Sequence, residues 1–360
     1  MSKSIPATAR NHALFWAGVF ILFLGFVWLF SGVLTPFVLG LAIAYLLSPV
    51  VDRMEKCKLP RWAGALFILL IFYAIIATLL VLISPLLYRE AQQLIAASPD
   101  MFEKIWAYAS PHLAWVQHYI GDGDLESAKS MVLNNAGKAL GVGGGVLAGI
   151  GGGGKAVAGF FGTLAITPLV AFFMMNEWPR IINWFDSLLP RDGRDTIRNL
   201  LLQIDGKIAG FIRGQISVAC ALALFYAVGL ALTGVKFGFM IGLCAGLLYI
   251  VPFLGTAFGI VAGLTSALFQ GFTLALAGKI AAVFVVGQIV ETYFLTPRLV
   301  GGSVGLHPVW ILFSVMAGGS LFGITGMLLA VPVAAIAGVL IGFAIARYKT
   351  GPYYAGKGEK

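Results

Sequence analysis

Three ionisable residues lie within or beside strongly apolar sequence in the stretch 288–308, QIVETYFLTPRLVGGSVGLHP: Glu291, Arg298 and His307. A carboxylate at bilayer depth costs a few kcal/mol or more, about +2.5–3.5 kcal/mol on insertion scales for the related Asp. Such a residue normally faces a transport pathway or a polar partner. The surrounding Gly and Pro are also foreign to an uninterrupted membrane helix. The stretch therefore predicts the working part of a transporter.

Glu291 allows a structural and a functional interpretation. As a structural residue it would pair with Arg213 or Arg298, and as a functional residue it would carry a proton or a cation. We favour the functional interpretation. His307 directly precedes Pro308, so a turn at the start of a helix explains it better than a protonation-dependent gate does.

A second polar group lies in the stretch 205–215, DGKIAGFIRGQ, at the beginning of an apolar run. Its members are Asp205, Lys207, Arg213 and Gln215. Arg213 and Gln215 either pair with Glu291 or a substrate, or form a structural polar bridge. Gly206, Gly210 and Gly214 share one helical face, which predicts a seam of close helix packing.

Pro and Gly interrupt the apolar runs of the second half, and such breaks free backbone carbonyls. The residues expected at these breaks are Pro252, Gly255, Pro297, Gly301, Gly305, Gly319, Gly323, Gly326 and Pro332. Many secondary transporters bind ions or substrate at broken helices near the midplane. The segments around 252 and 319–332 therefore point to one site between them. The alternative is that they kink for packing alone.

The composition requires a membrane around these residues. Of 360 residues, 59% are hydrophobic and 11% are charged, with a mean hydropathy of +0.94. A soluble domain carries about 25% charged residues. Apolar runs long enough to serve as helices predict about eight membrane spans. The runs are 13–30, 36–51, 62–87, 155–175, 208–232, 237–269, 272–295 and 310–346. We expect an all-α polytopic membrane protein.

The runs 237–269 and 310–346 are too long for one upright span and contain Pro252 and Pro332. Each is either a kinked, tilted helix or a hairpin that turns back within the membrane.

Positive charge predicts the orientation. Lys and Arg gather in the loop 52–61, in the segment 178–207 and in the C-terminal tail. Eight spans put these regions on one side, which the positive-inside rule makes cytoplasmic together with both termini. The net charge of +9 thus indicates topology and attraction to anionic lipid, not nucleic acid.

The chain then divides into N-terminal membrane helices (1–87), an extracytoplasmic helical insert (88–154) and C-terminal transport-site helices (155–360). The insert is either a small helical cap or a substrate-capturing lid. His112 and His118 are six residues apart, off one helical face, so no metal site is expected there.

Two motif-like stretches do not predict an enzyme. The sequence GIGGGGKA at 149–156 has Ala156 where a phosphate-binding loop needs Ser or Thr. In GGSVG at 301–305, His307 follows the Ser too closely to serve as its base. No cofactor is expected.

The polar and Gly/Pro motifs resemble the autoinducer-2 exporter family, also described as PerM-like permeases. The resemblance is carried by D-x-K…R-G-Q at 205–215, P-x-x-G at 252–255 and E…P-x-x-x-G…G-L-H-P at 291–308. The last block is the most specific, and the N-terminal half matches only in layout. The resemblance implies a polytopic bacterial inner-membrane transport protein without ATP-driven parts, assembled as a homo-oligomer such as a pentameric ring.

Three functions remain open. The resemblance implies export of a small polar solute, such as a furanosyl quorum signal. We expect the segments around Pro252 and 319–332 to form the site. Polar groups of Glu291, Arg213 and Gln215 would replace water around the solute. It also admits Na⁺ (Li⁺, K⁺)/H⁺ antiport through Glu291. A non-transporting membrane scaffold whose insert binds a partner is the third.

Overall fold

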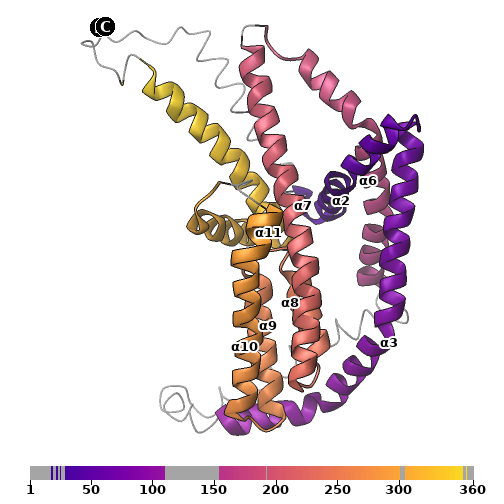
Figure 1. Ribbon diagram of the computed structural model, residues 1–360, viewed down its shortest axis with the longest axis vertical. Helices are drawn as coiled ribbons and strands as arrows, with labels where there is room; N and C mark the ends of the chain where they lie inside the picture. The colour runs from indigo at the N-terminus through magenta and orange to yellow at the C-terminus, as the bar shows by residue number, and fades with distance from the viewer. Residues whose placement is uncertain are drawn as a thin grey trace. The chain divides into compact units, whose positions relative to one another are not determined.

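A computed structural model describes residues 18, 22, 25, 29–109, 154–191, 193–300, 305–351 and 354 (Figure 1). Within these ranges the chain is helical and contains no strand, as the sequence predicts. Five of the described helices are long and apolar enough to cross a membrane. Most of the expected first span, 13–30, and most of the insert, 110–153, lie outside the described residues.

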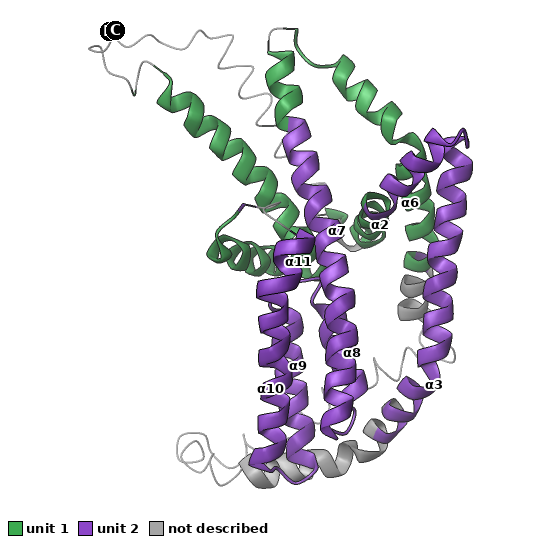
Figure 2. Cartoon of the chain, in the orientation of Figure 1, with its two compact units in different colours: residues 1–45, 163–200, 306–360 green, residues 46–162, 201–305 purple. Residues whose placement is uncertain are grey.

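The chain forms two compact units, which Figure 2 colours separately. Unit 1 consists of 1–45, 163–200 and 306–360, and unit 2 of 46–162 and 201–305. Each unit draws on stretches from both halves of the sequence. The division by sequence into 1–87, 88–154 and 155–360 is a separate prediction that these units do not test.

A short turn in unit 2 joins the end of α2 (Ser31–Lys56) to α3 (Arg61–Ala109). Arg61 fixes this turn, because its guanidinium contacts Asp52 at 2.8 Å and Glu55 at 2.7 Å. The helix α3 then runs without a break through the expected border at residue 87. The described beginning of the insert is therefore a continuation of the membrane helix.

The core of unit 2 is a helical bundle whose members lie side by side in Figure 1. Its helices are the part of α7 (Arg194–Thr233) from Leu201 on, α8 (Gly238–Leu248), α9 (Leu254–Phe269) and α10 (Leu274–Val290). Small residues let α7 and α8 approach closely: a Cβ on Gly246 would collide with the main chain of Ala223. By contrast, a Cβ added at Gly206 would have no atom within 4 Å, so the predicted seam of close glycine packing does not extend to that position.

The helices α8 and α9 form a hairpin. The Ser266 hydroxyl near the end of α9 donates a 2.5 Å hydrogen bond to the carbonyl of Lys236, just before α8 begins. The turn lies at Pro252 and Phe253, whose φ is +69°. At 1.5 Å per residue the two arms measure about 16 and 24 Å, short of the roughly 30 Å hydrocarbon core. Of the two alternatives for 237–269, the hairpin is the one observed.

The hairpin is attached to α3 at its beginning. Phe237, which precedes α8, has a left-handed backbone and offers no side-chain cap. The carboxylate of Glu90 on α3 replaces that cap and accepts a 2.9 Å hydrogen bond from the Met240 amide. A negative charge at the beginning of a helix also interacts favourably with the helix dipole.

In unit 1, α2 packs against α6 (Gly154–Ser187). A Cβ on Gly40 would lie 2.9 Å from the Thr167 carbonyl oxygen, so the two backbones are close. The hydroxyls of Thr35 and Thr325 share a 2.7 Å hydrogen bond, which joins α2 to α11 (Pro308–Lys349).

The helix α11 is folded sharply at Phe322 and Gly323, where φ of the glycine is +59°. Only glycine adopts such a backbone readily. A Cβ on Gly318 would lie 2.5 Å from the Gly326 carbonyl oxygen, although eight residues of straight helix span about 12 Å. The two arms therefore fold back on one another, as the hairpin alternative for 310–346 requires.

The expected break at Pro332 is wrong. Pro332 is buried within the second arm of α11, and the non-helical backbone lies about ten residues earlier, at Phe322 and Gly323. Gly319 lies in the first arm, where a Cβ would meet the Met327 side chain. Glycine at the turn permits the reversal that a proline alone does not enforce.

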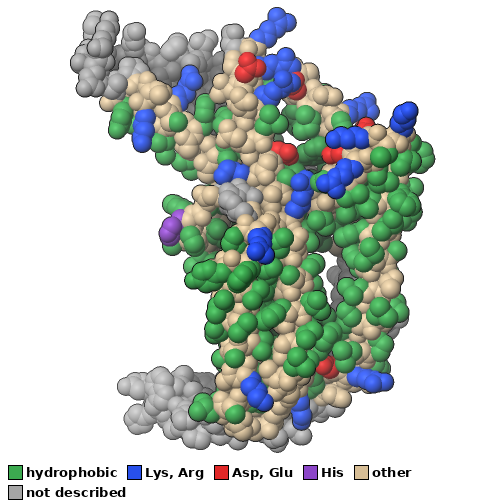
Figure 3. Space-filling view, in the orientation of Figure 1, with side chains coloured by type: hydrophobic (Ala, Val, Ile, Leu, Met, Phe, Trp, Pro, Cys, Tyr) green, Lys and Arg blue, Asp and Glu red, His purple; other side chains and the backbone are tan. Residues whose placement is uncertain are grey.

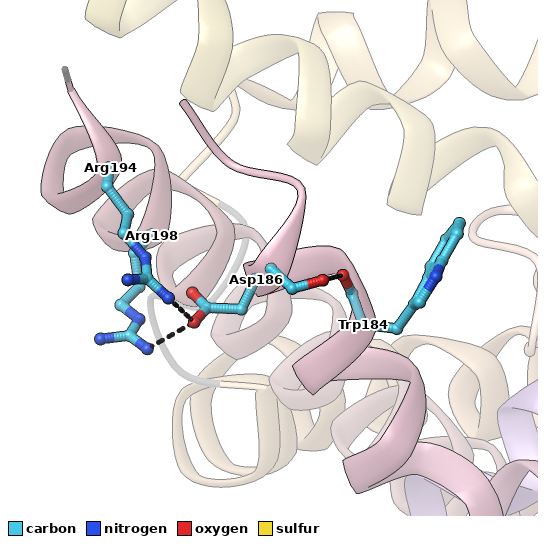
Figure 4. A network of polar contacts seen from close by, with 5 residues as sticks. Trp184, Asp186, Arg194 and Arg198 are labelled. Atoms are coloured by element: carbon cyan, nitrogen blue, oxygen red, sulfur yellow. Dashed lines mark hydrogen bonds and ion pairs between the residues drawn. The ribbon is translucent and has the colours of Figure 1, made fainter. Parts of the chain in front are cut away.

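A cluster of charges joins the end of α6 to the beginning of α7 (Figure 4). The carboxylate of Asp186 accepts hydrogen bonds from Arg194 at 2.5 Å and from Arg198 at 2.9 Å. The hydrogen bond from Arg194, with the charges of both guanidiniums, lowers the pKa of Asp186. We refer to Asp186, Arg194 and Arg198 as the Asp186 clamp.

Candidate functional site

Glu291 lies where α10 changes into a π-helix, η1 (Glu291–Val300). Pro297 has no amide hydrogen and would clash with the backbone in a regular α-helix, and a wider turn relieves such a conflict. The chain thus remains helical at Pro297, where the sequence predicted a break. π-helical turns are often found at functional sites.

Four neutral side chains surround the half-buried Glu291 carboxylate. Thr296, one π-turn later, donates a 2.6 Å hydrogen bond to Oε1. Gln288 and Thr292 contact Oε2, and the Tyr249 hydroxyl lies beside the same carboxylate. Within the described chain, Glu291 has no ion pair. We call these five residues the Glu291 cluster.

The tip of the α8–α9 hairpin is anchored next to this cluster. The buried Gln215 on α7 donates a 2.6 Å hydrogen bond to the Tyr249 carbonyl at the end of α8. The phenol of the same tyrosine reaches Glu291. Gly255 packs against Ala245 and Tyr249, because a Cβ there would overlap the Ala245 carbonyl oxygen. Tyr249 therefore connects the hairpin to α7 through its backbone and to η1 through its side chain.

The remaining residues of the second polar group lie on α7. Arg213 is half-buried, and its neighbour Gly214 lies against η1: a Cβ there would be 2.6 Å from the Leu299 carbonyl oxygen. Asp205 and Lys207 are also half-buried, about two turns before Arg213. None of the hydrogen bonds that define the Glu291 cluster comes from these three residues.

The other expected positions have varied surroundings. His307 caps α11: its Nδ1 accepts a 3.3 Å hydrogen bond from the Val309 amide, as the helix-start interpretation predicts. The Arg298 guanidinium lies over the Phe294 ring, 6.0 Å from its centre. Gly305 has a φ of +63° and lies three residues before the start of α11, and Gly301 lies outside the described residues.

The two interrupted segments belong to different units, with Pro252 in unit 2 and the 319–332 segment in unit 1. The site that the sequence predicts between them is therefore untested. The cluster described here lies entirely within unit 2.

Sequence reasoning did not identify Tyr249, Gln288 or Thr296 as partners of Glu291. Gln288 precedes Glu291 by three residues and Thr296 follows it by five, so helical spacing carried a signal for both. No such signal pointed to Tyr249, because it belongs to the hairpin and lies 42 residues before Glu291, in an apolar run.

A carboxylate held by neutral hydroxyl and amide groups can exchange a proton or contact a cation or a polar solute. Among the described residues, no group of three or more His, Cys, Asp or Glu side chains could hold a metal ion. Hydrophobic side chains spread over the visible face of the surrounding helices (Figure 3). The arrangement is a small polar centre within an apolar bundle.

The sequence model of the AI-2E transporter family matches residues 18–345. The chain belongs to this family. Proteins similar to it include YrrI of Bacillus subtilis strain 168, an inferred transport protein, with 27% identity over 85% of both chains. PerM of Escherichia coli K12, an inferred permease, is 24% identical over 87% of both chains. The AI-2 transport protein TqsA of E. coli K12 is 25% identical over 93% of both.

Family membership and the apolar helices together identify a multi-pass membrane protein with a transporter role. The three relatives above are named for transport or permeation, not for catalysis.

Proposed function

We propose that this AI-2E protein is a secondary transporter that exports a small polar solute, such as an autoinducer-2-like signal, across the bacterial inner membrane. One observation carries the proposal: a half-buried carboxylate, bound by neutral side chains, lies beside the tip of a helical hairpin. The name of the relative TqsA supports the choice of solute.

The hairpin tip and the Glu291 cluster supply the groups that replace water around a solute in an apolar bundle. Glu291, Gln288 and Thr296 present oxygen and nitrogen atoms of both hydrogen-bonding types. Gln215 holds the tip in position through the Tyr249 carbonyl. Arg213, Asp205, Lys207 and His307 extend the proposed pathway toward the ends of their helices.

The alternative is Na⁺ (Li⁺, K⁺)/H⁺ antiport, which one feature favours. Within the described chain the Glu291 carboxylate has no cationic side chain as a partner. Such a carboxylate can alternate between a proton and a monovalent cation, whereas an arginine partner would compete with both.

We further propose that both termini face the cytoplasm and that the protein assembles as a homo-oligomer, such as a pentamer, in contact with lipid. The basic residues Arg53, Lys56 and Lys58 at the α2–α3 turn support this orientation. The large hydrophobic side chains exposed on the described helices support contact with lipid or a second copy.

Proteoliposomes containing the purified chain test the proposal. Labelled autoinducer-2 efflux that exceeds that of empty vesicles and is lost in Glu291→Gln supports solute export. Cation-driven pH change inside the vesicles that is lost in the same variant supports antiport instead. Flux that Glu291→Gln leaves unchanged contradicts the role of the Glu291 cluster in either function.

A further inference from the structure

A groove of about 290 Å³ lies between α9 and α10, which run side by side in unit 2 (Figure 1). Its wall on α9 is the row Thr256, Ile260 and Leu264, spaced four residues apart on one helical face. At 1.5 Å per residue this row is about 12 Å long. The lining residues on α10 are Ile280, Ala281, Phe284, Val285 and Gln288. The groove is therefore elongated and mostly apolar.

The two polar lining residues lie at the same end of the groove. The short connection 270–273 joins α9 to α10, so the two helices run antiparallel. Thr256 near the beginning of α9 thus lies opposite Gln288 near the end of α10. The other end, at Leu264 and Ile280, is apolar. A ligand that fits the groove has one polar end and an apolar remainder.

The groove opens on the outside of the helical bundle. Ala281 is exposed on α10, and Val285 beside it is 58% exposed. Across the groove, Ile260 on α9 is 38% exposed. Exposed apolar side chains on a membrane span lie toward lipid or a second protein chain. A ligand dissolved in the bilayer can therefore enter the groove from the side.

The Glu291 carboxylate lies one helical turn beyond the polar end of the groove. Residues three apart on a helix are neighbours, so Glu291 continues the row that reaches Gln288. The Gln288 amide donates a hydrogen bond to this carboxylate. Glu291 lies inside the apolar span Leu274–Val300, and its hydrogen-bond partners are neutral. A carboxylate in such surroundings favours a cationic ligand.

We propose that the groove and Glu291 together bind an amphipathic organic cation, which consists of an ammonium group on an alkyl chain. The ammonium donates hydrogen bonds to the Glu291 carboxylate, and the chain lies along the groove toward Leu264. Ligand sites commonly combine an apolar lining with a few polar groups in this way. The negative charge disfavours an anionic amphiphile. This inference goes beyond the proposed export, because the ligand enters from the lipid and shares only Glu291 with the polar solute.

Equilibrium binding of radiolabelled octylammonium to the full chain in phosphatidylcholine nanodiscs tests the proposal. Empty nanodiscs measure partition into the lipid, and phosphatidylcholine has no net charge that would recruit the cation. With C–C bonds of about 1.5 Å, an extended eight-carbon chain covers most of the groove. Octan-1-ol is the chemical comparison, because it has the same chain and an uncharged head.

Three variants separate the charge from the groove. Glu291→Gln removes the charge and keeps the shape of the side chain. Ala281→Trp fills the groove from an exposed position. Ala282→Trp is the matched control, because Ala282 is also exposed and is not among the lining residues. Neither tryptophan replaces a buried side chain, so both variants should fold.

We expect the wild type and Ala282→Trp to bind octylammonium equally and more tightly than octan-1-ol. Glu291→Gln should bind octylammonium about ten- to hundredfold more weakly, the effect of a hydrogen bond to a charged group. Its binding of octan-1-ol should not change. Ala281→Trp should bind both ligands about tenfold more weakly, because it displaces about two methylene groups from the groove.

Three results would overturn the proposal. The first is octylammonium binding by the wild type that does not exceed that of empty nanodiscs. The second is equal binding by the wild type and Glu291→Gln, which would leave the groove to an uncharged chain such as a lipid tail. The third is equal binding by Ala281→Trp and Ala282→Trp, which would place the ligand outside the groove.

The binding site and the proposed function can fail separately, because the binding test needs no transport. Flux of polar solute that depends on Glu291, without octylammonium binding, overturns the binding site alone. Octylammonium binding that depends on Glu291 and Ala281, by a chain that moves neither solute nor inorganic cations, overturns the proposed function alone.

Discussion

At the scale of single residues, two polar side chains in the same bundle have different tasks. Gln215 is buried, and its side-chain amide donates a hydrogen bond to the Tyr249 carbonyl. This carbonyl lies at the end of α8 and has no partner within the helix. Glu291 is half-buried, and its neutral partners leave its charge uncompensated. The first arrangement stabilises a fold, whereas the second keeps a charge available for exchange.

We therefore predict that Gln215→Ala mainly destabilises the protein. The Tyr249 carbonyl would lose its partner, which lowers the free energy of unfolding by about 1–3 kcal/mol. Thermal unfolding in detergent should show a lower midpoint for this variant. Gln203→Ala is the control, because Gln203 is exposed on the same helix. Equal midpoints for both variants would contradict the structural role of Gln215.

The same contrast separates what the sequence can predict about the site from what it cannot. Glu291 and Gln215 are detectable because a polar residue in an apolar run is unusual. Tyr249 is not, because aromatic residues are common in membrane helices and its hydroxyl acquires meaning only from a contact across the bundle. Hydropathy does not report such contacts.

At the scale of elements, small residues determine how closely the helices pack. Gly246 on α8 lies against the Ala223 backbone, whereas Gly278 on α10 has no atom within 4 Å of an added Cβ. Both glycines are inside helices, so they differ in packing alone.

We predict opposite effects of alanine at these two glycines. Gly246→Ala should lower the free energy of unfolding by about 1–3 kcal/mol, since it forces α7 and α8 apart. Gly278→Ala should leave it unchanged or raise it by up to about 1 kcal/mol through helix propensity. Unfolding midpoints and the monodispersity of both variants in detergent measure the difference. If Gly246→Ala unfolds at the same midpoint as the wild type, the contact between α7 and α8 is looser than described.

The Asp186 clamp gives a prediction about pH. Its arginines lower the pKa of Asp186 in the folded protein, so the stabilisation is fully present above the ordinary Asp pKa, about 3.9. It is lost as the pH falls through the lower, folded value. The difference in unfolding midpoint between the wild type and Asp186→Asn should therefore be constant from pH 5 to pH 8 and shrink only below about pH 4. A difference that changes between pH 5 and pH 8 would point to another titrating group.

Hydropathy predicts the helices, but it does not predict the two places where the chain turns back, at Phe253 and at Gly323. Pro252 and Pro332 predicted equal interruptions, yet only Pro252 lies at a turn. In α11 the turn is at Gly323, where a backbone of positive φ is needed. A proline shows where a helix can bend, whereas the packing of the two arms decides whether the chain folds back.

At the scale of the whole molecule, the hairpin changes how the chain crosses the membrane. A single span over 237–269 would bring Lys236 and the beginning of α10 to opposite sides. The observed hairpin instead returns the chain to the side from which it came. If the termini are cytoplasmic, as proposed above, that side would be the outer one, and Cys57 at the α2–α3 turn would face the cytoplasm.

Accessibility to a membrane-impermeant maleimide tests this topology. In a background with Cys220 and Cys244 replaced by serine, exposed Cys57 should react in inverted vesicles but not in right-side-out ones. With Cys57 also replaced, Lys236→Cys and Leu274→Cys should each react in right-side-out vesicles only. Both positions are exposed, so the side of the membrane that they face, and not burial, decides the labelling.

Labelling of Lys236→Cys and Leu274→Cys from opposite sides would contradict the hairpin. Labelling of both from the Cys57 side would contradict the orientation, because the short arms of the hairpin would then enter the membrane from the cytoplasm.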